Sequence, residues 1–415
     1  SVQAFFCYNG YMQKMMKLLF CVLICLMSGC QTKPDIRPQE SVTVVSETTP
    51  GEAYAWLNQY LDAFLPEGYK LPVQLKDGTA VSWSVASGHG EVRDGQLFKT
   101  DGALEYEPIV LEATVGEQIC TFDKLLLLDQ YMGYLMTYFS GDGDTKETVK
   151  YAFTYNGNLW YVLNDQQPVL TASKGTKRIR DPYIMRKKDG SFCLMATQGY
   201  DNPSIYLFDT DDLVNFENER LMQINEHEDG TVGKQAWAPE GFYDRTRDQY
   251  FIYWSSPEDG GMFCNYSDDM NTIGYPEKLL DTGFPVIDGT IVKTGYDYAI
   301  ILKDERQPME QYSQLFLGYS DTDYRHFDQF DMNYITGHQS EGPFTLKRDY
   351  DYILFYDDYT RSQFQAISYY DLRKPEEFED IKMSDLIFPM ENVKHASVIP
   401  ITYKEWKRVT EVYGE

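Results

Sequence analysis

The amino-acid sequence predicts an all-β fold in which a five-bladed β-propeller follows a small β-sandwich. Beyond Tyr131, strand-like runs rich in aromatic residues alternate with turns of Gly, Asn or Asp. A period near fifty residues, with several strands in each unit, is typical of propeller blades. The period is marked by four positions that follow one another at intervals of 57, 50 and 53 residues: Asp181, Ala238, Asp288 and Glu341.

The segment from 130 to 415 has room for five such blades. Only four of the marked positions precede the last strand-like run, which begins at Lys394. The strands between 131 and 175 are therefore expected to pair with the C-terminal run and complete the fifth blade. Closing the ring in this way removes exposed sheet edges.

Residues 49–129 predict a separate small domain. Thr49 to Glu52 has the pattern of a helix start, with Pro at the first helical position, and apolar residues follow at helical spacing. From about Leu71 to Leu128 some six short alternating runs are separated by turns, which predicts a β-sandwich.

The N-terminal segment has the pattern of a secretion signal. Met15-Met16-Lys17 precedes the apolar run Leu18 to Met27, which is too short to span a bilayer, and Ser28-Gly29-Cys30 closes it. The layout resembles a bacterial lipoprotein signal, which implies lipidation of Cys30 and anchoring to the outer membrane, facing either the periplasm or the exterior. Residues 1–14 would then precede the true start of the chain, and residues 31–48 would form a linker.

Composition narrows the classes of partner. The chain has 64 Asp and Glu against 37 Lys and Arg, a formal charge of -27, which argues against nucleic acid and anionic membrane surfaces. A neutral glycan fits better, and membrane contact is expected only through the lipid anchor. Three cysteines beyond the signal, too widely spaced for a disulfide framework or a zinc cluster, are expected to be buried hydrophobes: Cys120, Cys193 and Cys264.

Three carboxylates stand near the start of successive repeats: Asp181, Asp288 and Glu341. Each is followed by a strand-like run, so each is expected on the inner strand of a blade. A closed ring of blades would aim all three at one axis. Hydrolysis of a glycosidic bond needs this arrangement, because a general acid and a general base must face each other across a sugar.

Five motifs, in this order, resemble glycoside hydrolase family 43: Arg180 to Arg186, Trp237 to Glu240, Ile287 to Ile291 with Lys303 to Glu305, Glu341 to Pro343, and Lys394 to Pro400. The resemblance covers about residues 131 to 400. It implies a five-bladed propeller that cleaves arabinose- or xylose-containing glycans with inversion. The segment in front resembles the degenerate bacterial immunoglobulin-like modules that precede sugar hydrolases.

The resemblance also implies a role for each carboxylate. Asp181 corresponds to the general base, which deprotonates water on the face opposite the leaving group. Glu341 corresponds to the general acid, which holds a proton until the glycosidic oxygen takes it. Asp288 corresponds to a third carboxylate that orients the acid. Inversion implies that Asp181 and Glu341 lie roughly 6.5 to 9.5 Å apart.

Four further residues are candidates for binding the substrate. Trp237 could offer its face to a sugar and Glu240 could bond a hydroxyl, although both also suit the start of a blade. His395 matches a family position in the central channel that holds an ion through water in some members. Arg180 is expected to steady a carboxylate, and Arg186 is expected to be a solvated strand residue. No cofactor is required and no metal-ligand spacing is visible, while a structural calcium stays open by resemblance.

These observations predict an enzyme, an inverting exo-acting α-L-arabinofuranosidase that works on plant-type polysaccharide or oligosaccharide. A β-xylosidase, a β-galactofuranosidase and an exo-galactanase stay open, because loops such as 199–203 and 307–313 shape the cavity and the sequence does not place them. A second class is a non-catalytic surface glycan-binding lipoprotein. Retention of all three carboxylates favours the enzyme.

Overall fold

The structure is a computed structural model that describes residues 50–127, 129–141, 147–294, 297–337, 339–348, 350–360 and 363–414. The expected signal, Cys30 and the whole of the expected linker lie outside these ranges. The described residues all belong to one compact unit. Across the described ranges, no helix has the length and apolar character needed to cross a bilayer.

The first part of the described chain is the predicted helix and β-sandwich. Helix α2 (Pro50–Tyr60) is followed by a four-stranded sheet of order β1-β7-β6-β3 and a three-stranded sheet of order β2-β5-β4. Alternate residues of β6, such as Ile109 and Leu111, pack with Leu57 of the helix in one core. The strands are β1 (Phe64–Pro66), β2 (Tyr69–Lys70), β3 (Val81–Ser87), β4 (Gly90–Arg93), β5 (Gln96–Lys99), β6 (Tyr106–Val115) and β7 (Gln118–Leu127).

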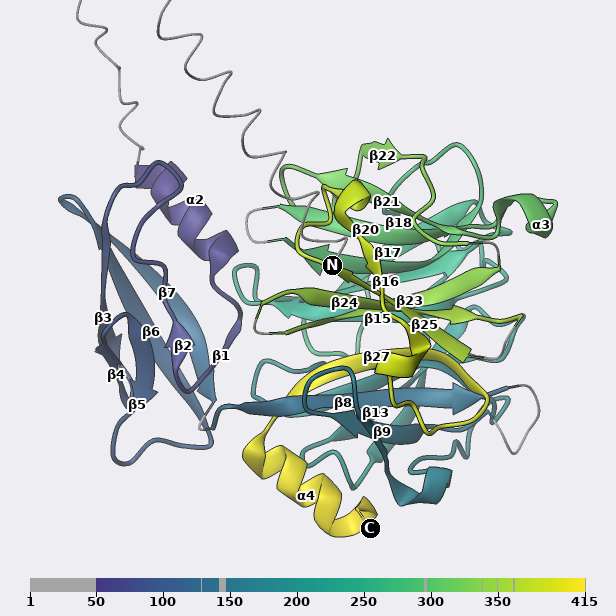
Figure 1. The fold of residues 1–415 in the computed structure, drawn as a ribbon, viewed down its shortest axis with the longest axis horizontal. Coiled ribbons are helices and arrows are strands. Elements are labelled where there is room, and N and C mark those ends of the chain that lie inside the picture. Colours follow the sequence, from purple (N-terminus) through teal and green to yellow (C-terminus); the bar gives the residue numbers. More distant parts are fainter. Residues whose placement is uncertain are drawn as a thin grey trace, which may run out of the picture. The chain divides into compact units, whose positions relative to one another are not determined.

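The rest of the described chain forms five four-stranded antiparallel sheets, which are the blades of the predicted propeller (Figure 1). Blade 1 is β11 (Ile179–Arg186), β12 (Phe192–Gln198), β13 (Ser204–Thr210) and β14 (Glu217–Gln223). Blade 2 is β15 (Trp237–Asp244), β16 (Gln249–Ser256), β17 (Gly261–Ser267) and β18 (Glu277–Lys278). Blade 3 is β19 (Val286–Lys293), β20 (Tyr298–Asp304), β21 (Leu315–Ser320) and β22 (Gln329–Asp331).

Blade 4 is β23 (Ser340–Lys347), β24 (Tyr352–Asp358), β25 (Gln363–Tyr369) and β26 (Glu379–Asp380). Blade 5 joins the two ends of the repeat region: β27 (Val393–Thr402) pairs with β8 (Tyr131–Ser140), followed by β9 (Lys150–Thr154) and β10 (Trp160–Val162). Short helices lie in the connections and at the end: η2 (Asn164–Gln166), α3 (Met309–Tyr312), η3 (Pro375–Glu377), η4 (Met383–Asp385) and α4 (Tyr403–Tyr413).

The five inner strands form a closed ring. Strands β11, β15, β19, β23 and β27 contact one another in this order, and β27 contacts β11 again. The pairing of β27 with β8, for example Val398 opposite Met136, is the closure that the sequence predicted. The predicted all-β fold, in which a five-bladed propeller follows a β-sandwich along the chain, is thereby confirmed.

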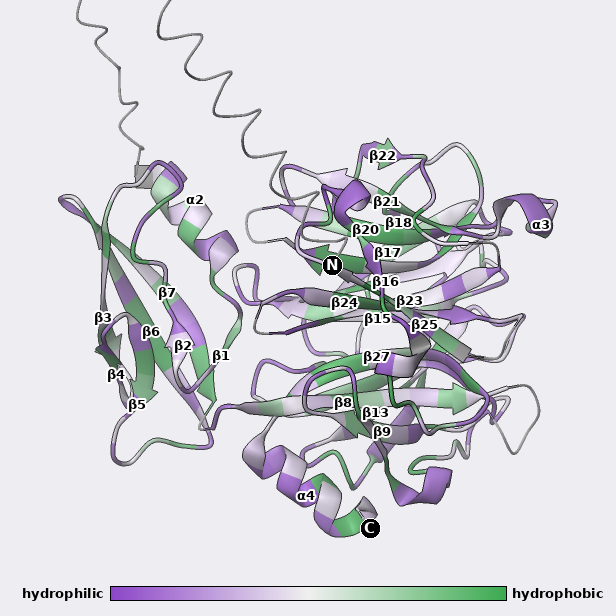
Figure 2. Cartoon of the chain, viewed as in Figure 1, coloured by the Kyte–Doolittle hydropathy of each residue, from purple (hydrophilic) through white to green (hydrophobic). Residues whose placement is uncertain are grey.

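The core lies between neighbouring blades. All seven residues of β12 are buried, and successive residues face opposite sides: Phe192 and Leu194 belong to one apolar cluster, Cys193 and Met195 to the next. Hydrophobic residues therefore concentrate in the strands, as Figure 2 shows. Cys120, Cys193 and Cys264 are free and buried, as expected.

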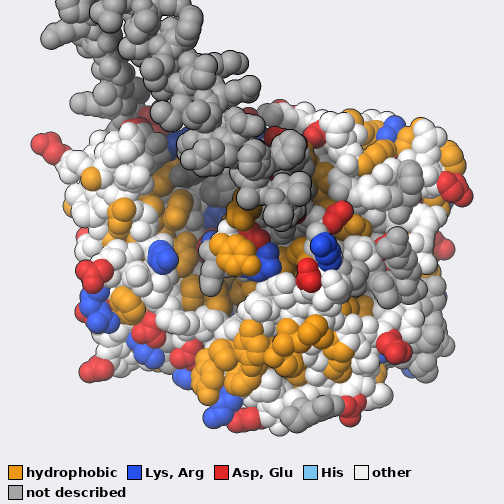
Figure 3. All heavy atoms as spheres, viewed as in Figure 1, with side chains coloured by type: hydrophobic (Ala, Val, Ile, Leu, Met, Phe, Trp, Pro, Cys, Tyr) orange, Lys and Arg blue, Asp and Glu red, His pale blue; other side chains and the backbone are white. Residues whose placement is uncertain are grey.

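Helix α4 corrects one expectation. Arg186 is not a solvated strand residue, because Glu405 of α4 covers it and accepts hydrogen bonds from its Nη1 at 2.5 Å and its Nη2 at 2.9 Å. Both side chains are buried. The helix starts with a capping box between Thr402 and Glu405. Figure 3 shows hydrophobic side chains gathered on the surface around this helix.

Candidate active site

Each inner strand carries a β-bulge close to its start, where the register against the neighbouring strand shifts. Such bulges break the ladder locally and re-aim side chains, and they are over-represented next to active sites. The same irregularity at the same place in all five blades shows that the blades are structural repeats. The two residues left out of the ladder are Asp181-Pro182, Ala238-Pro239, Asp288-Gly289, Gly342-Pro343 and His395-Ala396.

The first residue of the bulge has a positive φ in four blades: 48° at Asp181, 45° at Ala238, 53° at Asp288 and 54° at Gly342. A residue other than Gly that adopts such a positive φ carries about 1–3 kcal/mol of backbone strain. The register also corrects the sequence repeat, because the equivalent of Asp181 and Asp288 in blade 4 is Gly342. Glu341 stands one residue earlier, in the last pair before the bulge, where it lies opposite Asp357.

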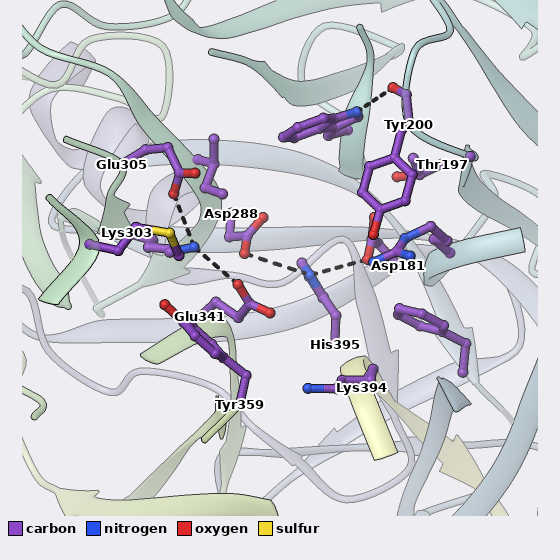
Figure 4. Close-up of a pocket in the computed structure, with 16 residues that line it drawn as sticks. Asp181, Thr197, Tyr200, Asp288, Lys303, Glu305, Glu341, Tyr359, Lys394 and His395 are labelled. Carbon is purple, nitrogen blue, oxygen red and sulfur yellow. Dashed lines mark hydrogen bonds and ion pairs between the residues drawn. The ribbon is translucent and has the colours of Figure 1, made fainter. Parts of the chain in front are cut away.

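All five inner strands contribute to the wall of one cavity of about 440 Å³ (Figure 4). The side chains of the three candidate catalytic carboxylates therefore meet at the centre of the ring, although 160 residues separate the first from the last. Six of the seven predicted catalytic and substrate-binding residues line this cavity: Asp181, Asp288, Glu341, Arg180, Trp237 and His395.

Asp288 is the most buried of the three carboxylates, with 8% of its side chain exposed. Its Oδ2 accepts a hydrogen bond from the backbone N–H of Gly342 at 3.1 Å, and its own backbone N–H donates to Ser255 Oγ at 3.0 Å. Burial raises the pKa of Asp288 to about 6, and the nearby charge of Glu341 adds to this while that of His395 opposes it. Asp288 is thus tied directly to the chain beside Glu341.

His395 joins two of the carboxylates. Its Nδ1 lies 3.5 Å from Oδ1 of Asp181 and 3.8 Å from Oδ2 of Asp288. Burial lowers the pKa of His395, but the carboxylates of Asp288 and Asp181 outweigh this and raise it above its usual value. The imidazole therefore favours its charged form, which compensates part of the negative charge of the cavity.

Glu341 contacts a buried cation. Nζ of Lys303 lies 3.0 Å from Oε2 of Glu341 and also 3.0 Å from Oε2 of Glu305, and only 3% of the Lys303 side chain is exposed. The ring of Tyr359 lies 5.5 Å from the same Nζ. Burial lowers the pKa of Lys303, but Glu341 and other carboxylates outweigh this and raise it above its usual range. Glu341 itself keeps 30% of its side chain exposed, toward the cavity.

Glu240 is not among the residues that line the cavity. It is buried behind it, where its oxygens accept hydrogen bonds from Tyr253 Oη at 2.5 Å and Thr290 Oγ1 at 2.8 Å. Burial raises its pKa to about 7, which these two hydrogen bonds partly oppose. We assign it no contact with a sugar, because its carboxylate is already occupied by the propeller's own hydroxyl groups.

Trp237 and Arg180 form an aromatic wall together with Tyr200. The indole Nε1 of Trp237 donates to the carbonyl oxygen of Tyr200 at 2.6 Å, and the two rings meet edge to face. The guanidinium of Arg180 lies 4.4 Å above the ring of Tyr200 and donates to Glu147 Oε1 at 2.8 Å. The carboxylate that Arg180 contacts is thus a buried one behind the wall, which no sequence motif indicated.

Sequence reasoning missed several residues of the wall. Tyr200 and Met309 come from the two loops that the sequence could not place. Lys303 had a signal, because it follows the apolar run Ala299 to Leu302 inside a strand, and a charged residue in a buried strand requires a partner. Its partner Glu341 was not readable, because it belongs to the next blade.

The described residues offer no cluster of side chains that would ligate a calcium ion directly. Calcium takes about six to eight oxygen ligands. Within the described ranges, no group of three or more His, Cys, Asp or Glu is arranged to hold a metal ion. One oxygen of Asp288 is already bonded to the backbone of Gly342.

Comparison with known protein families decides the class of this protein. Residues 129–407 match the family described as a probable glycosyl hydrolase domain, which is related to glycoside hydrolase family 43. The chain belongs to this family. The match spans well over half of the sequence and includes the whole ring of blades, and the predicted enzyme class is confirmed. This glycoside hydrolase has no match among curated proteins.

Solved structures similar to this glycoside hydrolase are distant. A thermostable family-43 glycoside hydrolase has 18% identity and a TM-score of 0.40, over 51% of this chain and 75% of the other. An α-L-arabinofuranosidase from Lactobacillus brevis has 19% identity and a TM-score of 0.39, over 49% and 72%. An exo-β-1,3-galactanase from Phanerochaete chrysosporium has 11% identity and a TM-score of 0.40, over 49% of each chain. These similarities identify no substrate.

Proposed function

We propose that this glycoside hydrolase is an inverting, exo-acting α-L-arabinofuranosidase that removes terminal residues from plant-type polysaccharide or oligosaccharide. The observation that supports the chemistry is that Asp181 of blade 1 and Glu341 of blade 4 line the same cavity, with Asp288 of blade 3 bonded to the chain next to Glu341. Two carboxylates from different blades in one cavity provide the base and the acid that inversion requires.

In the proposed reaction, Asp181 accepts a proton from water as the water oxygen bonds to the anomeric carbon. Glu341 donates its proton to the glycosidic oxygen, which leaves with the electron pair of the broken C–O bond. Asp288 holds the backbone of Gly342, and so the strand that carries Glu341, in place. His395, between Asp181 and Asp288, keeps both carboxylates oriented and limits their mutual repulsion.

The size and the wall of the cavity support removal of a single terminal sugar. A volume of about 440 Å³ is near the lower end of small-ligand sites. Trp237 and Tyr200 supply aromatic surface on one side, and Met309 comes from the loop on another. Aromatic faces pack well against the apolar faces of sugar rings.

The test is release of p-nitrophenol from arabinofuranoside, xylopyranoside and galactofuranoside substrates, together with release of sugar from arabinan, xylan and galactan. We expect the arabinofuranoside to be cleaved fastest. On arabinan, Glu341→Gln should lower kcat at least about 100-fold, as loss of a general acid does. The loss should be smaller on the p-nitrophenyl substrate, because nitrophenolate leaves without much protonation.

Glu258→Gln is the matched control, because Glu258 pairs with Lys234 on the surface, away from the cavity. Faster cleavage of the xylopyranoside or of the galactofuranoside would replace the proposed sugar but keep the mechanism. A folded protein that binds polysaccharide and cleaves none of these substrates would show the binding lipoprotein instead. Proton NMR of the first-formed sugar should show inverted configuration, and retention would make Asp181 a nucleophile.

We further propose that the protein is held at the bacterial outer membrane by a lipid on Cys30. The support is the signal-like pattern of Met15 to Cys30 in the sequence. Labelled palmitate should be incorporated into the protein expressed in a bacterial host and not into Cys30→Ser, which should appear in the soluble envelope fraction. Equal labelling of both forms would reject the anchor.

A further inference from the structure

Lys303 bridges two carboxylates of different blades. It lies on β20 of blade 3, opposite Ile287 in the ladder, and reaches Glu341 on the inner strand of blade 4. Its second partner, Glu305, follows the end of the same strand and also lines the cavity. Because Lys303 is almost fully buried, its charge is poorly screened by water and acts strongly on both carboxylates.

The other charged groups around Glu341 come from four further strands, β19, β27, β24 and β11. Asp288 on β19 adds negative charge, and His395 and Lys394 on β27 add positive charge. Asp357 on β24 is the ladder partner of Glu341 and is itself paired with Lys394 at 3.2 Å. Asp181 lies across the cavity beside His395. Of the residues that face Glu341 in the described chain, Lys303 alone has a charge–charge contact with it.

We propose that Lys303 and Glu305 form a positioning pair that sets the pH range in which Glu341 delivers its proton. This inference rests on the proposed function, in which Glu341 is the general acid. Oε2 of Glu341 contacts Lys303, so Oε1 is the oxygen that carries the proton. When this proton moves to the glycosidic oxygen and the C–O bond breaks, the carboxylate that remains develops its charge 3.0 Å from the Lys303 ammonium.

The two partners act in opposite directions. Lys303 stabilises the ionised carboxylate of Glu341 through its direct charge contact. Glu305 competes for the same ammonium and adds negative charge, which weakens this effect. Without Glu305, the ammonium of Lys303 would act on Glu341 alone. Without Lys303, the carboxylate left after proton transfer would lose its charge partner in the described chain.

The experiment measures the pH profile of kcat/KM for wild type, Lys303→Met, Lys303→Arg and Glu305→Gln. The alkaline limb of this profile reports loss of the proton from the acid. It should move up by about one pH unit in Lys303→Met and down by about half a unit in Glu305→Gln, and it should stay near wild type in Lys303→Arg. Lys187→Met is the matched control, because Lys187 is also paired, with Asp209, but lies outside the cavity.

A purely structural role would lower activity or thermal stability in both variants without displacing the limb in opposite directions, and that result would overturn the proposal. If Lys303→Met does not fold, Glu305→Gln carries the test alone, and an unmoved or raised limb in it rejects the proposal. A side-chain 13C NMR titration of Glu341, assigned by its loss in Glu341→Gln, should show the same shifts without substrate.

The titration also separates this inference from the proposed function. A wild type that hydrolyses no glycoside removes the proposed function, and with it the role of Lys303 in delivering a proton. An active wild type whose Glu341 titrates identically in all variants keeps the function and removes the inference.

Discussion

Oδ2 of Asp288 accepts a hydrogen bond from the backbone N–H of Gly342 at 3.1 Å. The two residues occupy equivalent bulge positions in neighbouring blades, and both have a positive φ. The bond therefore links the third carboxylate to the chain that carries Glu341, rather than to the Glu341 side chain. Asp288 can hold the strand that carries Glu341 in place even while the charge of Asp288 changes.

The hydrogen bond of Asp288 to Gly342 and the negative charge of Asp288 can be separated by substitution. Asn keeps an oxygen for the Gly342 N–H and tolerates a positive φ, but it removes the charge, whereas Ala removes both. We expect kcat to fall roughly 100-fold in Asp288→Asn and further in Asp288→Ala, within the range of acid–base effects. Steady-state kinetics on arabinofuranoside provide the comparison. A wild-type kcat in Asp288→Asn would show that the charge is not needed.

Gly342 should not tolerate a side chain. A Cβ at this position would lie 3.0 to 3.2 Å from atoms of His395, in addition to the strain of its φ of 54°. Gly342→Ala should therefore displace His395 from Asp181 and lower kcat/KM by at least about tenfold. Gly116→Ala is the matched control, because Gly116 has a φ of 61° and no atom near the added Cβ. Equal activity of the two variants would contradict the role of His395.

Asp357 should make the protein less stable as the pH rises. It is fully buried, and burial raises its pKa to about 7 even though Lys394 opposes this. The folded state thus holds a proton that the unfolded state loses near pH 4, so this stabilisation is complete below about pH 4 and is lost as the pH rises through about 7.

Asp357→Asn should reduce this loss. The free energy of unfolding, measured with urea, should decrease less between pH 5 and pH 8 in Asp357→Asn than in wild type. The difference between the two decreases should be up to about 3 kcal/mol. Glu240 and Asp288, with pKa values raised to about 7 and about 6, should leave a residual slope. An identical decrease in both proteins would contradict the raised pKa of Asp357.

The buried pair of Arg186 and Glu405 should hold α4 on the propeller. Removing one partner leaves a buried charge without compensation, so Arg186→Met should lower the free energy of unfolding by about 3–5 kcal/mol. The double variant Arg186→Met with Glu405→Leu should lose less free energy of unfolding than Arg186→Met alone. Urea unfolding of the wild type, the two single variants and the double variant gives the coupling energy, and the exposed pair of Lys234 and Glu258 should show much weaker coupling. Additive losses at Arg186 and Glu405 would show that the two charges do not interact.

The sequence already indicated much of the fold and of the site, because both depend on local patterns. Alternating apolar residues and turns define strands, and the spacing of about fifty residues defines blades. The motifs around Asp181, Asp288 and Glu341 sit at the start of inner strands, so placing the strands also placed these carboxylates near one axis. The closure by β27 and β8 followed from counting repeats against the length of the chain.

Other relationships depended on contacts between blades. The bulge register made Gly342, and not Glu341, the equivalent of Asp288, because the ladder partner decides which residue is skipped. Glu240 was expected near the substrate but faces Tyr253 and Thr290, since the bulge turns it behind the wall. Arg186 became buried because a helix more than two hundred residues later covers it.

By itself, the sequence determined the strands, their grouping into blades and the identity of three carboxylates, because each of these is set by residues close together in the chain. Only the tertiary structure decided what each carboxylate touches: Lys303 and Glu305 beside Glu341, Gly342 bonded to Asp288, and His395 between Asp181 and Asp288. These partners come from different blades, and their distances follow from how the ring packs and closes.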